Sequence, residues 1–459
     1  MAADRVLIIG GGVSGLATAY FLSRLGIRST IIEKANRLGG LIQTDVIAGC
    51  QLEAGPDSYL AAKPAVTNLA QEVPGLKDQI IGSNDAGRRI FIARDGKLVA
   101  MPKGMVMMVP GQWSPVLRSN LLSVGSKLRL LAETRSSPRE RLEDVSVGQF
   151  VEEHFGSEVL ELIAEPLLSG VYGGDPAKLS AKSVLPRFVG YEQMHGSLIR
   201  AVRRDARQRT GQSGSLFLSL RDGMQTLTDS LAAAIHSHAA VIHAEITQVD
   251  RSGSGWRVHA GGESHQAGEL VLACPTYVCG GLLEKTTPAL ASELFAIPYS
   301  SAILVTLVYA RATLGHPLNG FGFLVPHRFR KTIAASTWVS SKFPMRIRPN
   351  LAALRGFIVA ERATELMNAP EGALIELVRE DFRRLMGVIT PPLFSTVHKW
   401  PNSMPQYVVG HAKRQQDIAR MLKMSQGLFL SGNAYDGIGI PDCVRMAEET
   451  AKQVRARIA

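Results

Sequence analysis

The residues best suited to chemistry stand near the start of the chain, where three glycines follow the pattern Gly-x-Gly-x-x-Gly. They are Gly10, Gly12 and Gly15, and the acid Glu33 follows after a further stretch of chain. In this pattern the first glycine permits a tight turn, the second lets a pyrophosphate approach the backbone, and the third lets helix and strand pack closely. The acid can accept hydrogen bonds from ribose hydroxyls. The spacing therefore predicts a dinucleotide site.

Apolar stretches around these glycines predict the elements that would position them. A strand is expected at 5–9, an apolar helix at 16–22 that Gly26 ends, and a second strand at 29–32 that stops at Glu33. A glycine-rich turn before an ordinary helix would explain the glycines, but it would not explain why a strand, a helix and an acid stand around them in the order and spacing of a dinucleotide-binding unit. The unit predicts a helix N-terminus that faces the phosphates of a ligand.

A second glycine turn narrows the choice of cofactor. Residues 37–40 read Arg-Leu-Gly-Gly, and Gly55-Pro56 follows a further strand-like stretch. The guanidinium of Arg37 can bond phosphate or ribose oxygens, although Arg37 taken alone would be a solvated surface charge. An N-terminal fingerprint followed by Arg-x-Gly-Gly resembles the flavin-containing amine oxidase superfamily. This resemblance favours FAD over a nicotinamide.

The bulk composition bounds the class of protein. The 459 residues are enough for two or three domains, and a net charge of +11 favours anionic partners such as a carboxylate-rich substrate or a lipid surface. Nucleic acid is excluded because no basic motif interleaved with aromatics occurs. The four cysteines, Cys50, Cys274, Cys279 and Cys443, lack metal-ligand spacing, so we expect no metal site and a reducing compartment.

No signal peptide is expected, because the first strand starts so early, and no apolar run approaches the length of a spanning helix. We therefore expect a cytoplasmic protein. The run 105–116, rich in methionine and containing Trp113, is flanked by cations and has two interpretations. It dips into an anionic headgroup layer on the inner membrane face, or it packs inward on helices or the substrate cavity.

The chain is predicted to interleave its domains. A hairpin should turn at Asp95-Gly96, and strands of a second sheet are expected at 299–310, 321–325 and 355–360. The predicted domains are an FAD-binding domain at 1–60, 210–275 and 405–459, a substrate-binding domain at 61–101 and 276–404, and a helical domain at 102–209 that can associate with a membrane.

The C-terminal region offers a second ligand-facing element. A strand at 428–431 leads into small residues from Gly432 to Asp442, and a helix follows from Cys443. Backbone N–H groups at a helix start suit the negative pyrimidine edge of a reduced flavin. A simple glycine turn is the alternative.

Together these features resemble the oxygen-dependent, FAD-containing protoporphyrinogen oxidase family. The resemblance spans nearly the whole chain, and its more specific motifs are Gly-Val-Tyr, Gly-Phe-Gly and Pro-Gln-Tyr. The matching segments are 10–15, 37–40, Gly55-Pro56, 170–175 with Leu179-Ser180, 320–326, Trp400-Pro401, 405–407, Gly410-His411 and 432–435.

The resemblance implies an α/β fold with an α+β substrate domain. An FAD/NAD(P)-binding, Rossmann-like domain of the p-hydroxybenzoate-hydroxylase type would be interleaved with the substrate domain and the helical domain. Arg89 would bind a propionate, and Gly170 and Phe321 would line the porphyrinogen cavity. Pro441 departs from the family pattern and removes one backbone donor. The residues predicted to bind noncovalent FAD are Gly10, Gly11, Gly12, Val13, Ser14, Gly15, Glu33, Lys34, Arg37, Gly40, Leu41, Gly55, Pro56, Asp57, Ser58, Ile246, Trp400, Gly432, Ile438, Gly439, Ile440, Asp442 and Cys443.

The implied reaction oxidises protoporphyrinogen IX to protoporphyrin IX, with hydride transfer to FAD and release of hydrogen peroxide from oxygen. A carboxylate-bearing macrocycle needs an apolar cleft and arginines, and the flavin supplies the hydride acceptor, so no catalytic side chain is expected. Four alternatives stay open. They are oxidation of coproporphyrinogen III to coproporphyrin III, which the basic residues at 328–348 would suit, an amine oxidase, a carotenoid desaturase, and a flavin-bound protein without turnover. A homodimer is also open.

Overall fold

The computed structural model describes residues 6–208 and 214–458. Arg5, expected in the first strand, and the predicted domain boundary at 209–210 lie outside the described residues. The chain forms two compact units. Unit 1 comprises Met1–Ser83, Leu216–Pro298 and Lys413–Ala459, and unit 2 comprises Asn84–Ser215 and Tyr299–Ala412. The finer division into three domains stays a prediction.

A five-stranded sheet forms the centre of unit 1, and all its strands run parallel. β1 lies in the middle and is buried along its length, as the apolar run predicted. Because parallel strands end at the same edge, Gly10, Glu33, Ala273 and Ser431 all come to the carboxyl edge. The strand order is β12 (Ala239–His243), β2 (Ser29–Glu33), β1 (Val6–Ile9), β16 (Glu269–Leu272) and β22 (Leu428–Leu430).

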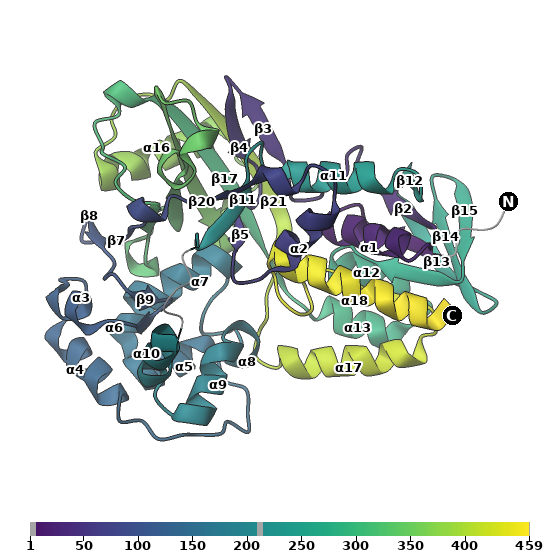
Figure 1. Ribbon diagram of the computed structural model, residues 1–459, viewed down its shortest axis with the longest axis horizontal. Helices are drawn as coiled ribbons and strands as arrows, with labels where there is room; N and C mark the ends of the chain where they lie inside the picture. Colours follow the sequence, from purple (N-terminus) through teal and green to yellow (C-terminus); the bar gives the residue numbers. More distant parts are fainter. Residues whose placement is uncertain (1–5, 209–213, 459) are drawn as a thin grey trace. The chain divides into compact units, whose positions relative to one another are not determined.

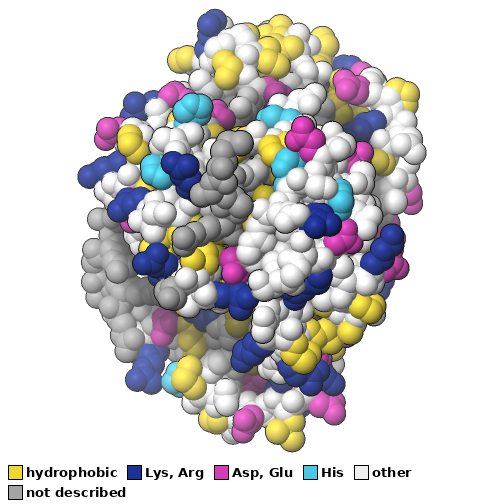
Figure 2. All heavy atoms as spheres, turned by 90° about the vertical axis from the view of Figure 1, so that its right-hand side faces the viewer, with side chains coloured by type: hydrophobic (Ala, Val, Ile, Leu, Met, Phe, Trp, Pro, Cys, Tyr) yellow, Lys and Arg dark blue, Asp and Glu magenta, His cyan; other side chains and the backbone are white. Residues whose placement is uncertain are grey.

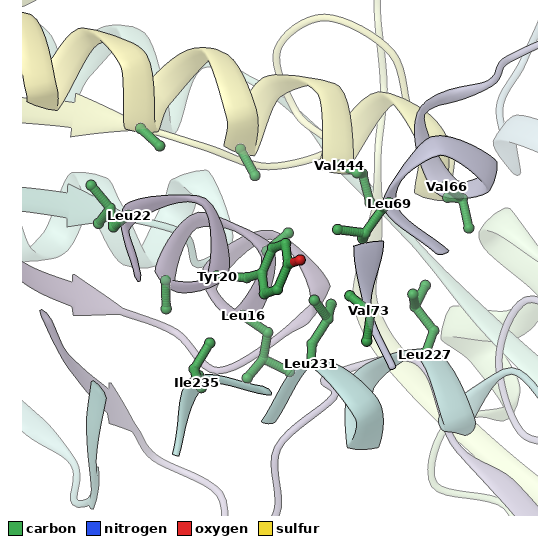
Figure 3. Packing of buried hydrophobic residues seen from close by; sticks show 14 of the residues in the cluster. Leu16, Tyr20, Leu22, Val66, Leu69, Val73, Leu227, Leu231, Ile235 and Val444 are labelled. Carbon is green, nitrogen blue, oxygen red and sulfur yellow. The ribbon is translucent and has the colours of Figure 1, made fainter. Parts of the chain in front are cut away.

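Four helices of unit 1, α1, α2, α11 and α18, meet in one apolar core (Figure 3). Leu16 and Tyr20 of α1 (Val13–Arg24) lie beside Leu231 of α11 (Gln225–Ile235) and near Val444 of α18 (Ile440–Ile458). α2 (Ala65–Glu72) adds Leu69 to the same core. Each fully buried aliphatic side chain here contributes about 1.5–3 kcal/mol. This packing fixes where the first turns of α1 and α18 lie.

Smaller elements complete unit 1. Two antiparallel sheets and a two-stranded ribbon accompany the central sheet, and three further helices lie between its strands β16 and β22 in the chain (Figure 1). In the face drawn in Figure 2, basic side chains are interspersed with acidic ones rather than gathered. The elements are β3 (Thr44–Ile47), β4 (Cys50–Glu53), β5 (Tyr59–Leu60), β6 (Ile80–Gly82), β11 (Phe217–Leu220), β13 (Ile246–Ser252), β14 (Gly255–Ala260), β15 (Glu263–Ala267), α12 (Thr276–Leu283), α13 (Pro288–Phe295) and α17 (His411–Met424).

Unit 2 is built on a seven-stranded sheet. The predicted hairpin is confirmed, with Asp95 and Gly96 at positive φ between its two strands. The strand predicted at 299–310 has these bounds in the structure, and the other two predicted strands of the second sheet are confirmed with shifted ends. Helix α16 (Glu371–Met386) packs its apolar side chains against this sheet. The strand order is β21 (Phe394–Pro405), β17 (Tyr299–Ala310), β20 (Leu351–Val359), β19 (Ala335–Trp338), β18 (Gly322–Leu324), β7 (Ile90–Arg94) and β8 (Lys97–Ala100).

The segment predicted to be helical is mostly helical in unit 2. A buried charge network holds it together: Arg141 Nε donates to Glu192 at 2.6 Å, and the ring nitrogens of His154 lie 3.1 Å from Glu133 and 3.3 Å from Glu192. No helix within 6–208 or 214–458 is long and apolar enough to cross a membrane. The helices are α3 (Trp113–Arg118), α4 (Val124–Glu133), α5 (Val147–Phe155), α6 (Ser157–Val159), η3 (Leu160–Ala164), α7 (Glu165–Tyr172), α8 (Ala181–Val184), α9 (Pro186–His195) and α10 (Leu198–Gln208).

Candidate functional site

Gly10 closes the turn that leaves β1. Its φ of +105° lies in the left-handed region that favours glycine, and a Cβ there would lie 2.7 Å from Ala273 O beyond the end of β16. Gly15, in the first turn of α1, is equally constrained, because its Cβ would lie 1.9 Å from Gly10 O. The protein itself therefore requires both glycines, in the turn and packing roles that the sequence predicted.

Gly12 differs, because no described atom fills the space beside it. Its φ of −72° suits any residue, and a Cβ would come no nearer than 3.9 Å to Gly40 Cα. The two loops are tied together, since Gly39 N–H donates to Gly11 O at 2.8 Å. Gly12 is the N-cap of α1 and makes no side-chain cap hydrogen bond. Bare backbone at a helix N-terminus is what a pyrophosphate needs to approach, so these residues fit a dinucleotide.

Glu33 ends β2 and already accepts two backbone hydrogen bonds. Its Oε2 accepts from Gly11 N–H at 2.6 Å, and its Oε1 accepts from Ala35 N–H at 2.8 Å. These bonds fix the carboxylate against the glycine loop. Because a carboxylate offers about four acceptor positions, Glu33 retains the capacity to accept from ribose hydroxyls.

Lys34 and Ile246 lie at the same carboxyl edge. Lys34 Nζ donates to Glu245 at 2.6 Å, and Ala244 N–H donates to Glu33 O at 2.9 Å. These bonds bring the start of β13, where Ile246 stands half-buried, beside the end of β2. The structure thus brings the adjacent predicted residues Glu33 and Lys34 beside Ile246, which is distant in the chain.

Arg37 holds the second glycine turn. Its NH1 donates to Leu38 O at 3.0 Å and to Ile42 O at 3.2 Å, and its NH2 donates to Gly40 O. The guanidinium therefore has a structural role within its own loop. Its predicted contact with phosphate or ribose stays a prediction.

The segment after β4 packs on the second glycine turn. A Cβ at Gly55 would lie 1.9 Å from Leu41 O, so glycine permits this close approach. Pro56 is half-buried, and Ser58 Oγ donates to Asp57 Oδ1 at 2.6 Å. The structure thus places this predicted segment against the loop of residues 37–42.

Asp442 organises the first turn of α18. Lys63 Nζ donates to both of its carboxylate oxygens, at 2.8 and 2.6 Å, and Gly439 N–H donates to Oδ2 at 3.1 Å. Gly437 has a φ of +99°, and a Cβ there would lie 2.3 Å from Asp442 Cγ. Because Asp442 occupies this space, glycine is required at position 437 in the turn that leads to Ile438 and Gly439.

The first turns of α1 and α18 meet. Burial raises the pKa of the Cys443 thiol to about 11, against a hydrogen bond with Ser14 that lowers it. Cys443 is therefore a neutral thiol near pH 7. In the same two helix turns, Ile440 of α18 is buried and Val13 of α1 is half-buried. Gly432, which follows β22, has a φ of +153°. Two helix N-termini at one edge give a positive electrostatic potential that suits a dinucleotide.

Unit 2 brings the three predicted substrate residues to neighbouring elements. Phe321 N–H donates to Arg89 O at 2.8 Å, and both precede the parallel pair of β18 and β7. Gly170 of α7 faces the same part of the sheet, because a Cβ at Gly170 would lie 3.7 Å from the Leu324 side chain on β18 and 4.0 Å from Ala335 on β19. The Arg89 side chain is exposed and Phe321 is buried. All predicted cofactor residues lie in unit 1 except one.

That residue is Trp400, on the edge strand β21 of unit 2. Its ring stacks with His398 at a centroid distance of 6.4 Å and packs on a small apolar cluster around Leu304. The predicted FAD contact of Trp400 stays a prediction.

Two sequence motifs contact each other within unit 2 and form what we call the clamp, made by Tyr172, Gly174 and Gln406. Gln406 Nε2 donates to Tyr172 O at 2.6 Å and to Ser300 Oγ at 3.0 Å. A Cβ at Gly174 would lie 2.0 Å from Gln406 Oε1, so glycine makes room for this amide. Tyr407 stacks on His411 at 4.0 Å. The Gly-Val-Tyr and Pro-Gln-Tyr motifs thus meet and hold the end of α7 to the end of β21.

Sequence reasoning missed Lys63, which neutralises Asp442 at the start of α18. No local pattern marks a lysine before α2 as the partner of an acid at the other end of the chain. It also gave no role to Cys274, which follows β16 directly beside the Gly10 turn.

Comparisons with known proteins agree with this site. A family model described as flavin containing amine oxidoreductase matches residues 13–455. Coproporphyrinogen III oxidase of Bacillus subtilis (strain 168) is 30% identical, over 96% of this chain and 95% of that protein. Protoporphyrinogen oxidase 1, chloroplastic, of Arabidopsis thaliana is 30% identical, over 98% of this chain and 87% of that protein.

Among solved structures, a candidate protoporphyrinogen oxidase from Exiguobacterium sp. 255-15 superposes with a TM-score of 0.88. It is 29% identical, and the similarity covers 99% of each chain. The predicted α/β class is confirmed by this likeness and by the parallel sheet of unit 1. Because the family model covers almost the whole sequence, the chain belongs to the flavin containing amine oxidoreductase family and is an FAD-dependent oxidoreductase.

Proposed function

We propose that this protein oxidises a porphyrinogen to a porphyrin, with protoporphyrinogen IX giving protoporphyrin IX. The observation that carries this proposal is 30% identity over 98% of the chain to a plant protoporphyrinogen oxidase. When bound, FAD accepts hydride from the macrocycle and returns the electrons to oxygen as hydrogen peroxide. Porphyrin and haem biosynthesis is the corresponding pathway.

The residues of unit 1 would bind and orient the cofactor. Gly12 and Gly40 leave room for the pyrophosphate, Glu33 accepts from the ribose, and the paired starts of α1 and α18 offer N–H groups to anionic edges. Asp442 keeps the α18 turn in place through Lys63. FAD is held without a covalent bond, because the buried, neutral Cys443 thiol is a poor nucleophile.

The residues of unit 2 would bind the substrate. Arg89 is exposed, so its guanidinium is available to pair a propionate in bidentate fashion. Phe321 and Gly170, which lie on neighbouring elements, would line the apolar part of the cavity. No side chain needs to transfer a proton in the hydride step as proposed.

Coproporphyrinogen III is the second candidate substrate, favoured by the relative from Bacillus subtilis. Two of the basic residues at 328–348, which could suit its additional propionates, already form ion pairs within the protein. Arg328 pairs with Glu161 at 3.3 Å, and Arg330 pairs with Glu165 at 2.8 Å. This pairing weakens the argument from those residues.

Oxygen uptake with each porphyrinogen tests the proposal. We expect uptake, hydrogen peroxide and porphyrin fluorescence with protoporphyrinogen IX, and a higher kcat/KM than with coproporphyrinogen III. The opposite ratio would make coproporphyrinogen III the substrate. A flavin spectrum without turnover of either porphyrinogen would contradict the proposal and favour an amine oxidase, a desaturase or a protein without turnover.

We also propose a cytoplasmic location and weak peripheral contact with anionic membranes. The expectation that the run 105–116 forms an exposed apolar tip is wrong for Met108, which is 1% exposed, and Trp113 lies half-buried under Arg203. The inward-packing interpretation fits these two residues better. Within the run Met107 is 38% exposed, and more exposed apolar side chains stand on α4, where Val124 is 72% and Leu128 60% exposed.

Sedimentation with anionic liposomes at low salt tests the membrane contact. We expect binding that is lost when Val124 and Leu128 are both replaced by serine, and kept in Trp113→Ser. Absence of binding by the unaltered protein would refute the contact. We also propose a homodimer, and sedimentation equilibrium tests this oligomeric state.

A further inference from the structure

Two cysteines lie together at the carboxyl edge of the unit 1 sheet. Cys274 follows the end of β16, and Cys279 stands in α12. Their sulfur atoms are 3.4 Å apart, and Cys279 Sγ donates to Cys274 O at 3.3 Å. A short turn through Pro275 joins the strand to the helix and brings the two thiols together. Both cysteines are free thiols in the structure.

The two thiols differ in access to solvent. Cys274 is half-buried and is followed in the chain by the exposed residues Pro275 and Tyr277, whereas Cys279 is fully buried. A small oxidant would therefore reach Cys274 first and would find Cys279 behind it. The other two cysteines, Cys50 and Cys443, are buried and lie on other elements of unit 1.

We propose that Cys274 and Cys279 are an oxidative modification site, which hydrogen peroxide converts into an intramolecular disulfide. Cys274, after losing its proton, attacks one oxygen of the peroxide, so the O–O bond breaks, a sulfenic acid forms and water leaves. The Cys279 sulfur then displaces the hydroxyl group of that sulfenic acid, which departs as a second water with the Cys279 proton. Two S–H bonds and one O–O bond are lost, and one S–S bond and two waters form.

The environment makes this reaction slow and pH-dependent. The hydrogen bond with the Cys279 thiol and burial raise the pKa of Cys274, so little thiolate is present near neutral pH. Since only the thiolate attacks peroxide, the oxidation rate should rise about tenfold per pH unit between about pH 7 and pH 9. The site would then respond to sustained rather than brief exposure.

The disulfide would act on the nucleotide loop. A Cβ at Gly10 would lie 2.7 Å from Ala273 O and 3.3 Å from Cys274 N, so the loop rests directly on this stretch of backbone. Bond formation must shorten the sulfur separation from 3.4 Å to about 2.05 Å. We infer that closing this gap displaces the backbone of Cys274 beside Gly10, and we therefore expect oxidised protein to release FAD faster.

Mass spectrometry of the holoenzyme after treatment with added hydrogen peroxide tests the site. Trypsin should place both thiols in one peptide, 258–285, which is expected to lose two hydrogen atoms in mass and to regain them with dithiothreitol. Because the peroxide is added, the outcome does not depend on the substrate proposed above. A peptide that gains oxygen instead, that links to another peptide, or that stays unchanged would overturn the proposal.

Two variants sharpen the test. Cys279→Ser removes the resolving thiol, so its Cys274 should accumulate a sulfenic acid that dimedone traps, while the unaltered protein yields mainly disulfide. Cys50→Ala is the matched control, because it removes a buried thiol of unit 1 that lies on β4, and it should behave as the unaltered protein. FAD release, followed by flavin fluorescence, should be faster only in proteins that form the disulfide, and equal release would refute the coupling.

Discussion

Gly12 and Gly15 belong to one sequence pattern, yet alanine at each should fail in a different way. A Cβ at Gly12 meets no described atom nearer than 3.9 Å, and its φ of −72° is ordinary for alanine. A Cβ at Gly15 would lie 1.9 Å from Gly10 O. Gly12→Ala should therefore fold normally and bind FAD poorly, whereas Gly15→Ala should lose stability even without the cofactor.

The expected magnitudes follow from these distances. Gly12→Ala gains up to about 1 kcal/mol from a less flexible unfolded chain and loses about 0.5–1 kcal/mol as a poorer cap, so its stability without FAD should change by less than about 1 kcal/mol. Gly15→Ala must push two backbone segments apart, which costs about 1–3 kcal/mol. Loss of one charged hydrogen bond to phosphate costs about 1.5–3 kcal/mol, so the Kd of Gly12→Ala for FAD should rise about ten- to a hundredfold.

Two measurements separate the roles of the glycines. Urea unfolding of the cofactor-free proteins gives their stabilities, and quenching of flavin fluorescence on titration gives the Kd for FAD. The reasoning fails if Gly12→Ala unfolds as easily as Gly15→Ala. It also fails if Gly12→Ala binds FAD as tightly as the unaltered protein, because the open space beside Gly12 would then have another purpose.

Three further predictions concern unit 2. Arg141→Met should cost about 3–5 kcal/mol in urea unfolding, because it leaves Glu192, whose side chain is 4% exposed, as a buried charge without its arginine. Burial raises the pKa of Glu153, but hydrogen bonds from Arg141 and others outweigh it and hold the pKa below 4.5. The ionised Glu153 therefore stabilises the fold fully above the pKa that it has in the unfolded chain, and this stabilisation is lost as the pH falls through its lower pKa in the folded protein. Since Glu153→Gln lacks this carboxylate, its free energy of unfolding should fall less on acidification than that of the unaltered protein. Arg89→Ala should raise KM about tenfold with little change in kcat, and Arg88→Ala, an equally exposed neighbour, should not; the reverse result would move the propionate contact to Arg88.

Local patterns predicted the elements that carry the cofactor site. The strand of β1, the turn at Gly10 and the hairpin at Asp95 follow from residues that are close in sequence, and the structure has all three. Helix α1 begins at Val13, before the predicted start at 16, because three residues of the 10–15 fingerprint, Val13, Ser14 and Gly15, already belong to its first turn. Short-range preferences were sufficient in these cases.

Long-range partners could not be predicted in the same way. Lys63 and Asp442 lie 379 residues apart, and either would pass in sequence for an ordinary surface charge. Strand β21 was missed because Pro401 interrupts it, yet proline is tolerated there since β21 is an edge strand. The predicted contact of Arg37 with phosphate or ribose stays a prediction, but the bonds from Arg37 to three carbonyls of its own loop could not be predicted, because they depend on the folded loop.

The motifs that made the resemblance specific contribute to architecture more than to chemistry. Gly174 makes room for the Gln406 amide, which donates to Tyr172 O, so three motif residues form one clamp inside unit 2. A protein with this clamp needs the same fold whether its substrate bears fewer or more propionates. We therefore expect substrate choice to depend on residues outside this clamp, and the exposed Arg89 is the residue that we propose for it. Kinetic comparison of the two porphyrinogens in Arg89 variants would consequently say more about substrate choice than any motif in the chain.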